Sequence, residues 1–410
     1  MRNIYTSIDI GSESVKIIVA EMIRNNMHIL AAVNKKSKGI KKGLVCDADK
    51  AIISVKEAVN DIEDMLGFSI QKVILNIPSY FSDFEVVTGE VDINNEDMEV
   101  TGHDITNVLK DALNDNLENS RDLVSVSPIE FKLDDTKGIK DPKGVVGSSL
   151  MVKAVMMTTL KKSVYSFIHI LEKADLIVVD LCFGALSDYE EFKNSTYDSL
   201  VGAVINIGSE ITTVSVFNRG ILIKSDIIQM GGKNIENDIS YIYKINRTES
   251  KIIKEKFAMA HKKFTNIDDV YEVFNVIDEK LLINQYEVSE VAVARIEEIL
   301  ELSKNKINDL TKKKISYIIV SGGTSEMIGL DYLISDFFGK NSEVGSINVL
   351  GVRDNKYSSC VGAIKYFYNK LRLRGKRYSM IDELDGDIKI ENNNNNVSVL
   401  GKVFGYFLDS

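Results

Sequence analysis

Near the start of the chain stands the stretch Ser7-Ile8-Asp9-Ile10-Gly11-Ser12-Glu13-Ser14-Val15-Lys16-Ile17-Ile18-Val19, which reads as an apolar strand, a tight turn and a second strand. Because Gly11 has no Cβ, a ligand can approach the backbone closely, and the amides and hydroxyls of Ser12 to Ser14 can point at an anion. Asp9, at the end of the strand, can orient water bound to Mg²⁺. An ordinary β-hairpin fits the same pattern.

A second copy of the pattern occupies Ala203 to Val214 and repeats I-x-I-G-S-E before it runs into another strand. Asn206 stands in this copy where Asp9 stands in the first. Such internal similarity predicts two related halves, each of which presents one hairpin to a shared cleft.

The composition limits the class of protein. With 410 residues, 44% of them hydrophobic, the chain is long enough for two or three domains with real cores. The net charge of −10 disfavours wholesale nucleic-acid binding. Cys46, Cys182 and Cys360 lie far apart and predict reduced core thiols of a cytoplasmic protein, with neither a zinc site nor disulfides. We expect no signal segment and no membrane span, so any membrane contact is expected at the surface.

The first half reads as an α/β domain with an insert. The lysine-rich stretch 34–43 is interpreted as a solvated turn rather than a ligand loop. A helix is expected from Asp49 as N-cap to Gly67 as C-cap, with its buried face at Ala51, Val55, Ala58, Ile62 and Met65. Residues 82–160 change composition and predict a small α+β insert, after which a strand near 176–181 resumes the first pattern.

The second half offers two more possible ligand edges. Gly231 and Gly232 precede a predicted helix and can bring amides near a phosphate, or simply connect a strand to a helix. Residues 246–314 read as charged helical segments. Gly322-Gly323-Thr324 follows the strand 315–320, and glycines at the carboxyl end of a strand are typical of a ligand edge. A last helix is expected from Ser359 to Leu373.

The carboxyl end predicts a tethered membrane anchor. The asparagine-rich stretch 379–396 is interpreted as a flexible linker. Residues 397–410 place six apolar side chains on one helical face, and we interpret them as a membrane-targeting amphipathic helix rather than a helix docked on its own domain. The basic cluster at 370–377 either binds anionic lipid or interacts favourably with the dipole at the C-terminus of its own helix. The predicted membrane-facing residues are Val397, Leu400, Val403, Phe404, Phe407 and Leu408.

The ordered motifs resemble those of the actin-like ATPase superfamily and, within it, of the FtsA family of bacterial cell-division proteins. Asp9 to Lys16 is similar to the first phosphate motif, Asn206 to Ser209 to the second, and Gly322-Gly323-Thr324 to the adenosine motif. More specific are the stretches 138–147 and 231–235 and the linker with its amphipathic end.

The resemblance implies an α/β actin-like fold with two domains around a nucleotide cleft. The first domain is expected at 1–81 and 161–199, interrupted by the insert at 82–160. The second is expected at 200–232 and 315–378, with a helical subdomain at 233–314, followed by the linker and the tail.

The resemblance also implies the ligands and the partners, which are ATP, Mg²⁺ through water on Asp9, the C-terminal tail of FtsZ, membrane lipid, other division proteins and further copies of the chain as actin-like filaments. The expected place is the cytoplasmic side of the membrane at the division site. Arg295 and Lys304 are possible contacts for an acidic tail, although a solvated helix face explains them equally. The expected nucleotide contacts are Gly11, Ser12, Glu13, Ser14, Lys16, Gly208, Ser209, Gly231, Gly232, Lys233, Glu298, Gly322, Gly323, Thr324 and Met327.

One departure bears on catalysis. The usual second phosphate motif is Asp-x-Gly-Gly-Gly, whereas this chain has Asn206, Ser209 and Glu210. Asp9 and Asn206 are the candidates for positioning metal and water, and the lost carboxylate predicts ATP binding with slow or absent hydrolysis. A small-molecule kinase of the same superfamily and a pilus or secretion adaptor of the same fold remain alternatives.

Overall fold

The computed structural model describes residues 2–114 and 116–381, and within them two five-stranded sheets share one topology. The first has the order β11-β6-β1-β2-β3, with β1 (Ile4–Ile10), β2 (Ser14–Ile23), β3 (Asn26–Lys36), β6 (Lys72–Ile77) and β11 (Ile177–Phe183). The second has the order β14-β13-β12-β17-β18, with β12 (Val201–Ile207), β13 (Thr212–Asn218), β14 (Ile221–Ile228), β17 (Tyr317–Ser321) and β18 (Ser342–Val344). The predicted internal repeat is confirmed.

Strand pairing puts the two hairpins at equivalent places. In the first sheet β1 pairs antiparallel with β2 and parallel with β6, and in the second β12 pairs in the same way with β13 and β17. Asp9 has Lys16 as its cross-strand neighbour, whereas Asn206 has Thr213. Each Ile-Gly-Ser-Glu turn therefore leaves the carboxyl end of the central strand of its sheet, where ligands of α/β folds bind.

Helix α1 (Ala48–Leu66) covers the first sheet together with α3 (Lys161–Glu172). Asp47, rather than the predicted Asp49, caps α1 by accepting from the Lys50 amide, and Gly67 ends it with a φ of 75°. The predicted apolar face is buried except for Met65, which is 62% exposed. Leu66, four residues after Ile62, packs against the core in place of Met65, because an i,i+4 spacing keeps a side chain on the same face.

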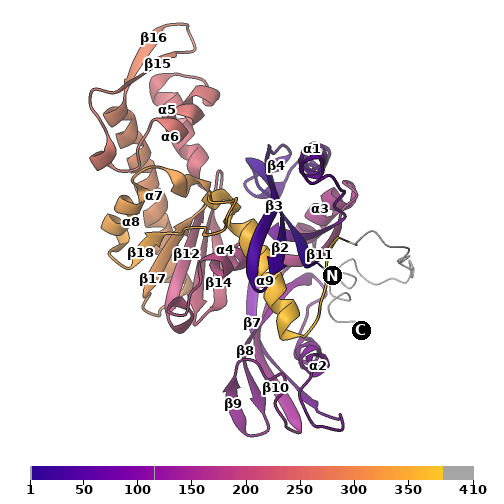
Figure 1. The fold of residues 1–410 in the computed structure, drawn as a ribbon. Coiled ribbons are helices and arrows are strands. Elements are labelled where there is room, and N and C mark those ends of the chain that lie inside the picture. Colours follow the sequence, from indigo (N-terminus) through magenta and orange to yellow (C-terminus); the bar gives the residue numbers. More distant parts are fainter. Residues whose placement is uncertain (1, 115, 382–410) are drawn as a thin grey trace.

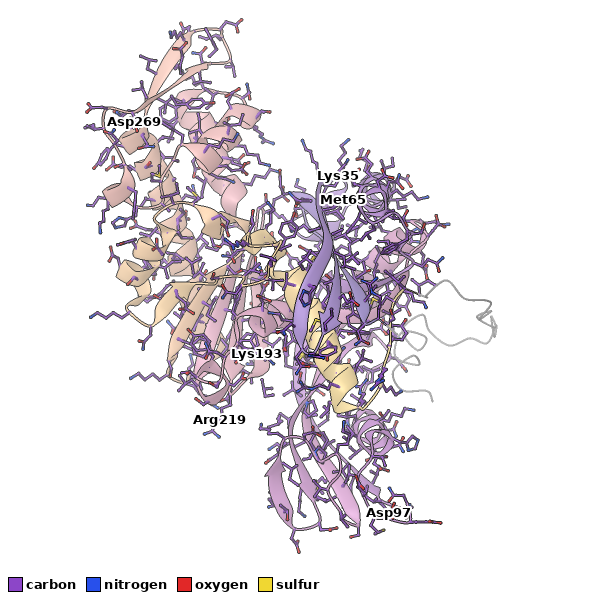
Figure 2. All side chains as sticks on the ribbon, in the orientation of Figure 1. Lys35, Met65, Asp97, Lys193, Arg219 and Asp269 are labelled. Atoms are coloured by element: carbon purple, nitrogen blue, oxygen red, sulfur yellow. The ribbon has the colours of Figure 1, made fainter. Side chains whose placement is uncertain are left out.

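The insert is a four-stranded antiparallel sheet with one helix across it. Its order is β7-β10-β8-β9, with β7 (Asp83–Asp92), β8 (Arg121–Leu133), β9 (Thr136–Ile139), β10 (Ser149–Leu160) and α2 (Gly102–Leu113). Gly89 lets α2 lie close on the sheet, since an added Cβ would be 2.4 Å from the Ala112 nitrogen. In Figure 2, Asp97 of the insert and Asp269 of the second domain lie towards opposite ends of the molecule.

The subdomain predicted as helical also contains strands. Its helices are α5 (Gly232–Tyr243), α6 (Arg247–Lys256) and α7 (Gln285–Leu310), and the hairpin of β15 (Val270–Phe274) and β16 (Lys280–Asn284) lies at its outer end (Figure 1). The hairpin was not predicted, because each of its strands has only five residues and stands among charged helical segments. Helix α8 (Leu330–Phe338) packs beside β18 in the second domain, and the short β4 (Ile40–Lys41) and β5 (Leu44–Val45) form a flap in the first. Cys46, directly after β5, is exposed, so the prediction of a core thiol is wrong there, whereas Cys182 and Cys360 are buried.

Two helices connect the domains and pack against each other (Figure 1). Helix α4 (Gly184–Phe192) leads from β11 towards β12, and α9 (Ser358–Leu373) returns from the second domain onto the first sheet. At their contact an added Cβ on Gly362 would lie 1.7 Å from the Ser187 carbonyl oxygen. The two connections are therefore held in direct backbone contact.

The carboxyl end departs from the prediction where the structure describes it. Met380 is buried and its amide donates to the Ile4 carbonyl oxygen at 2.9 Å, so 379–381 belong to the first domain rather than to the linker. Within the basic cluster, Lys370 pairs with the buried Asp180 and Arg374 is buried, so these two face the protein rather than lipid. The rest of the predicted linker and the amphipathic segment 397–410 lie outside the described residues. In the described part of the chain no helix is long and apolar enough to cross a bilayer.

Candidate functional site

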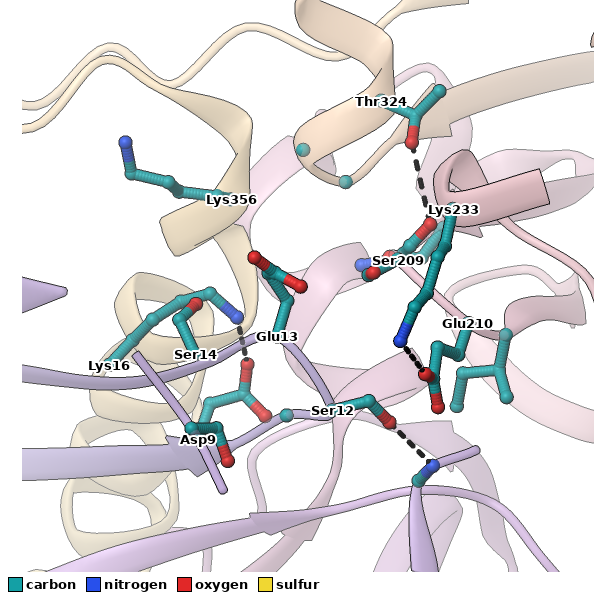
Figure 3. Close-up of a pocket in the computed structure, with 18 of the residues that line it drawn as sticks. Asp9, Ser12, Glu13, Ser14, Lys16, Ser209, Glu210, Lys233, Thr324 and Lys356 are labelled. Carbon is teal, nitrogen blue, oxygen red and sulfur yellow. Dashed lines mark hydrogen bonds and ion pairs between the residues drawn. The ribbon is translucent and has the colours of Figure 1, made fainter. Parts of the chain in front are cut away.

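A cleft of about 970 Å³ lies between the two domains, and both Ile-Gly-Ser-Glu turns line it (Figure 3). It brings together residues that are up to 350 positions apart in the chain, from Asp9 to Ser359. The predicted site residues that line it are Asp9, Gly11, Ser12, Glu13, Ser14, Lys16, Asn206, Gly208, Ser209, Lys233, Gly322, Gly323, Thr324 and Met327.

The first hairpin is closed by its own backbone. The Gly11 amide donates to the Ser14 carbonyl oxygen at 3.0 Å, and Ser12 Oγ accepts from the Gly43 amide at 2.9 Å. Lys16 Nζ donates to Asp9 Oδ2 at 2.7 Å. Burial lowers the pKa of Lys16, but the Asp9 carboxylate outweighs burial and the net pKa is raised. Lys16 therefore keeps its positive charge at the base of the turn.

The second hairpin has the same turn but a different support. The Gly208 amide donates to the Ile211 carbonyl oxygen at 2.9 Å. The Gly208 carbonyl oxygen in turn accepts from Gly232 at 2.9 Å, and that of Ser209 accepts from Lys233 at 2.8 Å. The start of α5 is thus tied to the turn. An added Cβ on Gly231 would lie 2.5 Å from the Gly208 carbonyl oxygen, which accounts for a glycine there.

Gly231 and Gly232 do not line the cleft. Both glycines are predicted ligand contacts, but the Gly232 amide already donates to the Gly208 carbonyl oxygen of the second hairpin. Their place is behind the hairpin, where they hold α5 close, and of this motif only Lys233 reaches the cleft.

The third edge of the cleft comes from β17 and the turn after it. Gly322 has a φ of 93°, and an added Cβ would lie 2.5 Å from the Ile207 carbonyl oxygen. Only glycine fits this left-handed position so close to β12. Thr324 Oγ1 donates to the Gly208 carbonyl oxygen at 3.4 Å, which joins this edge to the second hairpin (Figure 3).

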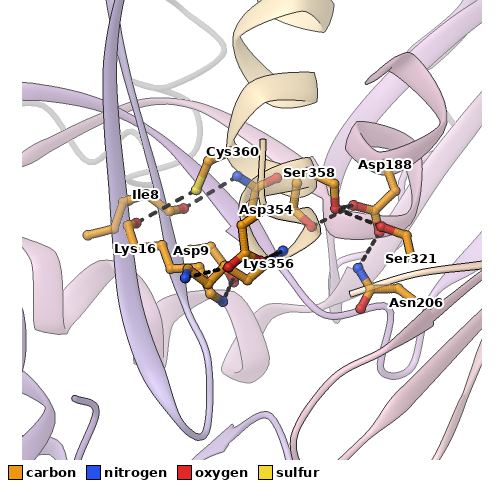
Figure 4. Close-up of polar contacts among 12 residues, drawn as sticks. Ile8, Asp9, Lys16, Asp188, Asn206, Ser321, Asp354, Lys356, Ser358 and Cys360 are labelled. Carbon is orange, nitrogen blue, oxygen red and sulfur yellow. Dashed lines mark hydrogen bonds and ion pairs between the residues drawn. The ribbon is translucent and has the colours of Figure 1, made fainter. Parts of the chain in front are cut away.

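Asn206 is held by a carboxylate that the sequence analysis did not single out (Figure 4). Its Nδ2 donates to Oδ2 of Asp188 in α4 at 2.7 Å. Oδ1 of Asp188 accepts from the hydroxyls of Ser358 and Ser359 at 2.7 and 2.8 Å. Burial raises the pKa of Asp188 to about 6. The cleft therefore has an acid beside the second hairpin, on the neighbouring helix instead of on β12.

The lysine-rich stretch is part of the cleft rather than a solvated turn. Asn34, Lys36, Ser37 and Gly43 line it. The Lys42 amide donates to Glu210 Oε2 at 2.6 Å and Lys42 Nζ to Gln229 Oε1 at 3.1 Å, so this loop reaches the second domain. The interpretation as a solvated turn is wrong, because local charge does not reveal a partner 168 residues away.

Glu298 is not among the described residues that line the cleft, and its contact with nucleotide stays a prediction. It pairs with Arg295, three residues earlier on the same face of α7. Arg295 also donates from Nε to Asp238 Oδ2 at 2.6 Å. Lys304 is more open, with its Nζ 5.4 Å from the centre of the Phe337 ring and its side chain 52% exposed.

Several charged residues of the cleft were not predicted. Asp188 comes from α4, and a group of basic and acidic side chains comes from α5, α6 and the segment before α9. Nothing in local periodicity marks these positions, although Gly231-Gly232 indicates that a helix starts close to the second hairpin. The unpredicted members are Lys36, Asp188, Glu236, Arg247, Lys251, Lys254, Glu255, Glu326, Asp354 and Lys356.

The donor set fits a hydrated magnesium ion that arrives with phosphates. Among the described residues no three His, Cys, Asp or Glu side chains are grouped to hold a metal directly. Mg²⁺ usually keeps several waters and takes one or two carboxylates plus phosphate oxygens. Asp9, whose side chain is 25% exposed and whose Oδ2 is bonded to Lys16, can supply its other oxygen to a metal-bound water.

The repeated domains and the cleft between their hairpins define an actin-like ATPase fold. A PilM-PilN type IV pilus biogenesis complex is similar with a TM-score of 0.58 and 12% identity, over 88% of this chain and 97% of that one. MreB5 of Spiroplasma citri bound to AMPPNP is similar with a TM-score of 0.55 and 12% identity, over 90% and 97%. At such identities the likeness concerns the fold.

Sequence comparison gives the family. The model for cell division protein FtsA matches residues 203–362, and the model for the SHS2 domain inserted in FtsA matches residues 83–158. Cell division protein FtsA of Bacillus subtilis (strain 168) is 28% identical over 94% of this chain and 89% of its own length. That of Enterococcus hirae is 28% identical over 89% and 83%. The chain belongs to the FtsA family of cell-division proteins.

Proposed function

We propose that this protein binds ATP in the cleft, assembles into actin-like filaments and tethers FtsZ filaments to the cytoplasmic face of the membrane at the division site. The observation that carries the ATP proposal is the pair of equivalent hairpins lining one cleft, with Lys16 at the base of the first. Support also comes from MreB5 of Spiroplasma citri, which has the same fold and was solved with ADP and with AMPPNP.

In this proposal the two turns bind the phosphates and the third edge binds the nucleoside. Gly11 to Ser14 and Gly208 to Ser209 present backbone and hydroxyl groups to the cleft, while Gly322 to Thr324 and Met327 form its far side. Titration calorimetry of the full chain with ATP and Mg²⁺ tests the proposal. Saturable binding that Lys16→Ala weakens at least about tenfold is expected, since a buried cation is lost. No heat of binding at millimolar ATP would contradict it.

Hydrolysis is proposed to be slow or absent. Asn206 cannot supply the carboxylate of the usual second motif, and both oxygens of the nearby Asp188 already accept hydrogen bonds. Positioning of metal and water carries most of the catalysis in phosphoryl transfer. Phosphate release at saturating ATP, compared with an enzyme-free blank, measures it.

Membrane tethering is proposed for the amphipathic segment 397–410. Deleting it should abolish sedimentation with liposomes and leave the affinity for ATP unchanged, because the hairpins and the glycine turn proposed to bind the nucleotide lie between residues 9 and 327. A deletion variant that still sediments fully contradicts the anchor. Within the full chain, Leu400→Asp combined with Phe404→Asp should have the effect of the deletion, whereas Ser398→Asp on the polar face should keep more of the binding.

The FtsZ tail is proposed to dock on the helical subdomain, where Arg295 and Lys304 lie on α7. Fluorescence anisotropy with a peptide of that tail tests this, and Lys304→Ala is the first variant because Lys304 is the more exposed of the two. Family membership favours this role over a pilus adaptor or a small-molecule kinase. ATP turnover stimulated by a sugar, with no peptide binding, would reverse that preference.

A further inference from the structure

Glutamate follows serine in both turns, at Glu13 and Glu210, and both side chains line the cleft. A carboxylate at a turn that offers amides to phosphate repels the ligand unless its charge is compensated. Both domains therefore place a carboxylate at the turn where phosphate is proposed to bind.

Each glutamate is bonded to a lysine of the cleft. Glu13 of the first domain pairs with Lys251 of α6, which belongs to the second. Glu210 Oε1 accepts from Lys233 Nζ at 2.5 Å. Burial raises the pKa of Glu210, but the hydrogen bond from Lys233 and that from the Lys42 amide outweigh burial, so the net pKa is lowered. Glu210 is therefore ionised at neutral pH.

Three further lysines of the cleft are also paired with carboxylates. The pairs are Lys16 with Asp9, Lys254 with Glu236 and Lys356 with Asp354. Among the described residues the cleft is lined by the basic Lys16, Lys36, Lys233, Arg247, Lys251, Lys254 and Lys356 and by the acidic Asp9, Glu13, Asp188, Glu210, Glu236, Glu255, Glu326 and Asp354. The described lining of the cleft therefore has no surplus of positive charge to offer a polyanion.

We propose that Glu13 and Glu210 make the cleft selective for the metal complex of a nucleoside triphosphate over the free triphosphate. This inference rests on the proposed binding of ATP. Each carboxylate repels phosphate and also occupies a lysine that could otherwise bind it. A divalent cation removes about half of the ligand's charge, so the metal complex meets much less of this repulsion.

The test compares Kd for ATP in excess Mg²⁺ with Kd in EDTA, by calorimetry on the full chain. For the double variant Glu13→Gln and Glu210→Gln we expect binding of free ATP to tighten about tenfold and that of Mg²⁺–ATP about threefold, because free ATP carries about twice the charge. The ratio of the two Kd values should thus fall about threefold. The matched control is Glu272→Gln, which breaks an exposed carboxylate–lysine pair with Lys280 on the β15–β16 hairpin, outside the described lining of the cleft, and should leave the ratio unchanged.

The outcomes separate the two proposals. Wild-type protein that binds ATP in neither condition overturns the proposed function, and the selectivity with it. Wild-type protein that binds, with a double variant that keeps the wild-type ratio or binds free ATP more weakly, overturns the selectivity alone. Glu13→Gln by itself, whose side chain is 37% exposed, repeats the test should the double variant melt at a lower temperature than the wild type.

Discussion

The hydrogen bond from Asn206 to Asp188 predicts that Asn206→Asp destabilises the protein at neutral pH. The exchange would set a second carboxylate 2.7 Å from one that is 1% exposed, and two carboxylates so close cannot both be ionised. One of them must stay protonated about three pH units above its ordinary pKa, which costs about 4 kcal/mol at pH 7. The shared proton forms a hydrogen bond that returns about 1 kcal/mol. We therefore expect a net loss of about 3 kcal/mol.

The sign of the pH dependence follows from the raised pKa of the pair. A carboxyl whose pKa is higher in the folded than in the unfolded protein destabilises the fold above the folded pKa, and the penalty vanishes below the unfolded pKa of about 4. Urea denaturation should show the deficit of Asn206→Asp shrinking by about 1.4 kcal/mol per unit from pH 7 down to about pH 5. A deficit that is constant with pH would refute the electrostatic explanation.

Exchanging the two side chains is the control. In the double variant Asp188→Asn and Asn206→Asp, an amide at 188 can donate to the carboxylate at 206 and still accept from Ser358 and Ser359, so most of the stability should return. The exchange also restores the carboxylate of the usual motif, and phosphate release at saturating ATP should therefore rise above that of the wild type. Equal release by both proteins counts against our account of the cleft, and a double variant as unstable as the single one refutes the pairing.

Further predictions concern the helices that join the domains and the first sheet. Gly362→Ala should cost about 3 kcal/mol or more and lower the melting temperature by calorimetry, because the new Cβ would lie 1.7 Å from the Ser187 carbonyl oxygen. Lys370→Met should cost about 3 kcal/mol in urea denaturation by leaving Asp180 buried without this partner, and adding Asp180→Asn should recover part of it. Burial raises the pKa of Glu191 to about 6, so the wild type should gain about 2 kcal/mol relative to Glu191→Gln between pH 7 and pH 4.

Much of the fold could be predicted from the sequence, because it depends on local patterns of residues. The I-x-I-G-S-E repeat predicts two equivalent hairpins, and the two sheets have the same strand order. Where the pattern was weak, the prediction failed. The hairpin of β15 and β16 was missed, and Asp49 was chosen over Asp47 as the cap of α1, since either aspartate precedes the periodic run and only the backbone geometry distinguishes them.

The cleft was accessible only in part. The backbone turns that line the cleft were predicted, because a glycine in the sequence indicates a positive φ or close contact between two backbone segments, as at Gly322. Of the charged lining only Asp9, Glu13, Lys16 and Lys233 were predicted as contacts. The other charged residues were missed because their partners lie far apart in sequence: 238 residues separate Lys251 from Glu13 and 18 separate Asp188 from Asn206. Glu298 shows the opposite case, since its partner Arg295 lies only three residues away on the same helix. Ion pairs between different helices and strands form only when the domains assemble, so they produce no periodic pattern in the local sequence.

Asp188 changes what the missing carboxylate of the second hairpin means. The acid is present in the cleft, but it lies on α4 and its bonds join α4 to β12 through Asn206 and to α9 through Ser358 and Ser359. A ligand group that draws the Asn206 amide away must leave a buried carboxylate with one partner fewer, which costs more than an ordinary hydrogen bond. Movement of the second hairpin is therefore coupled to both connections between the domains. An aspartate on β12 would face the ligand directly, whereas the carboxylate of Asp188 accepts hydrogen bonds that join the two domains.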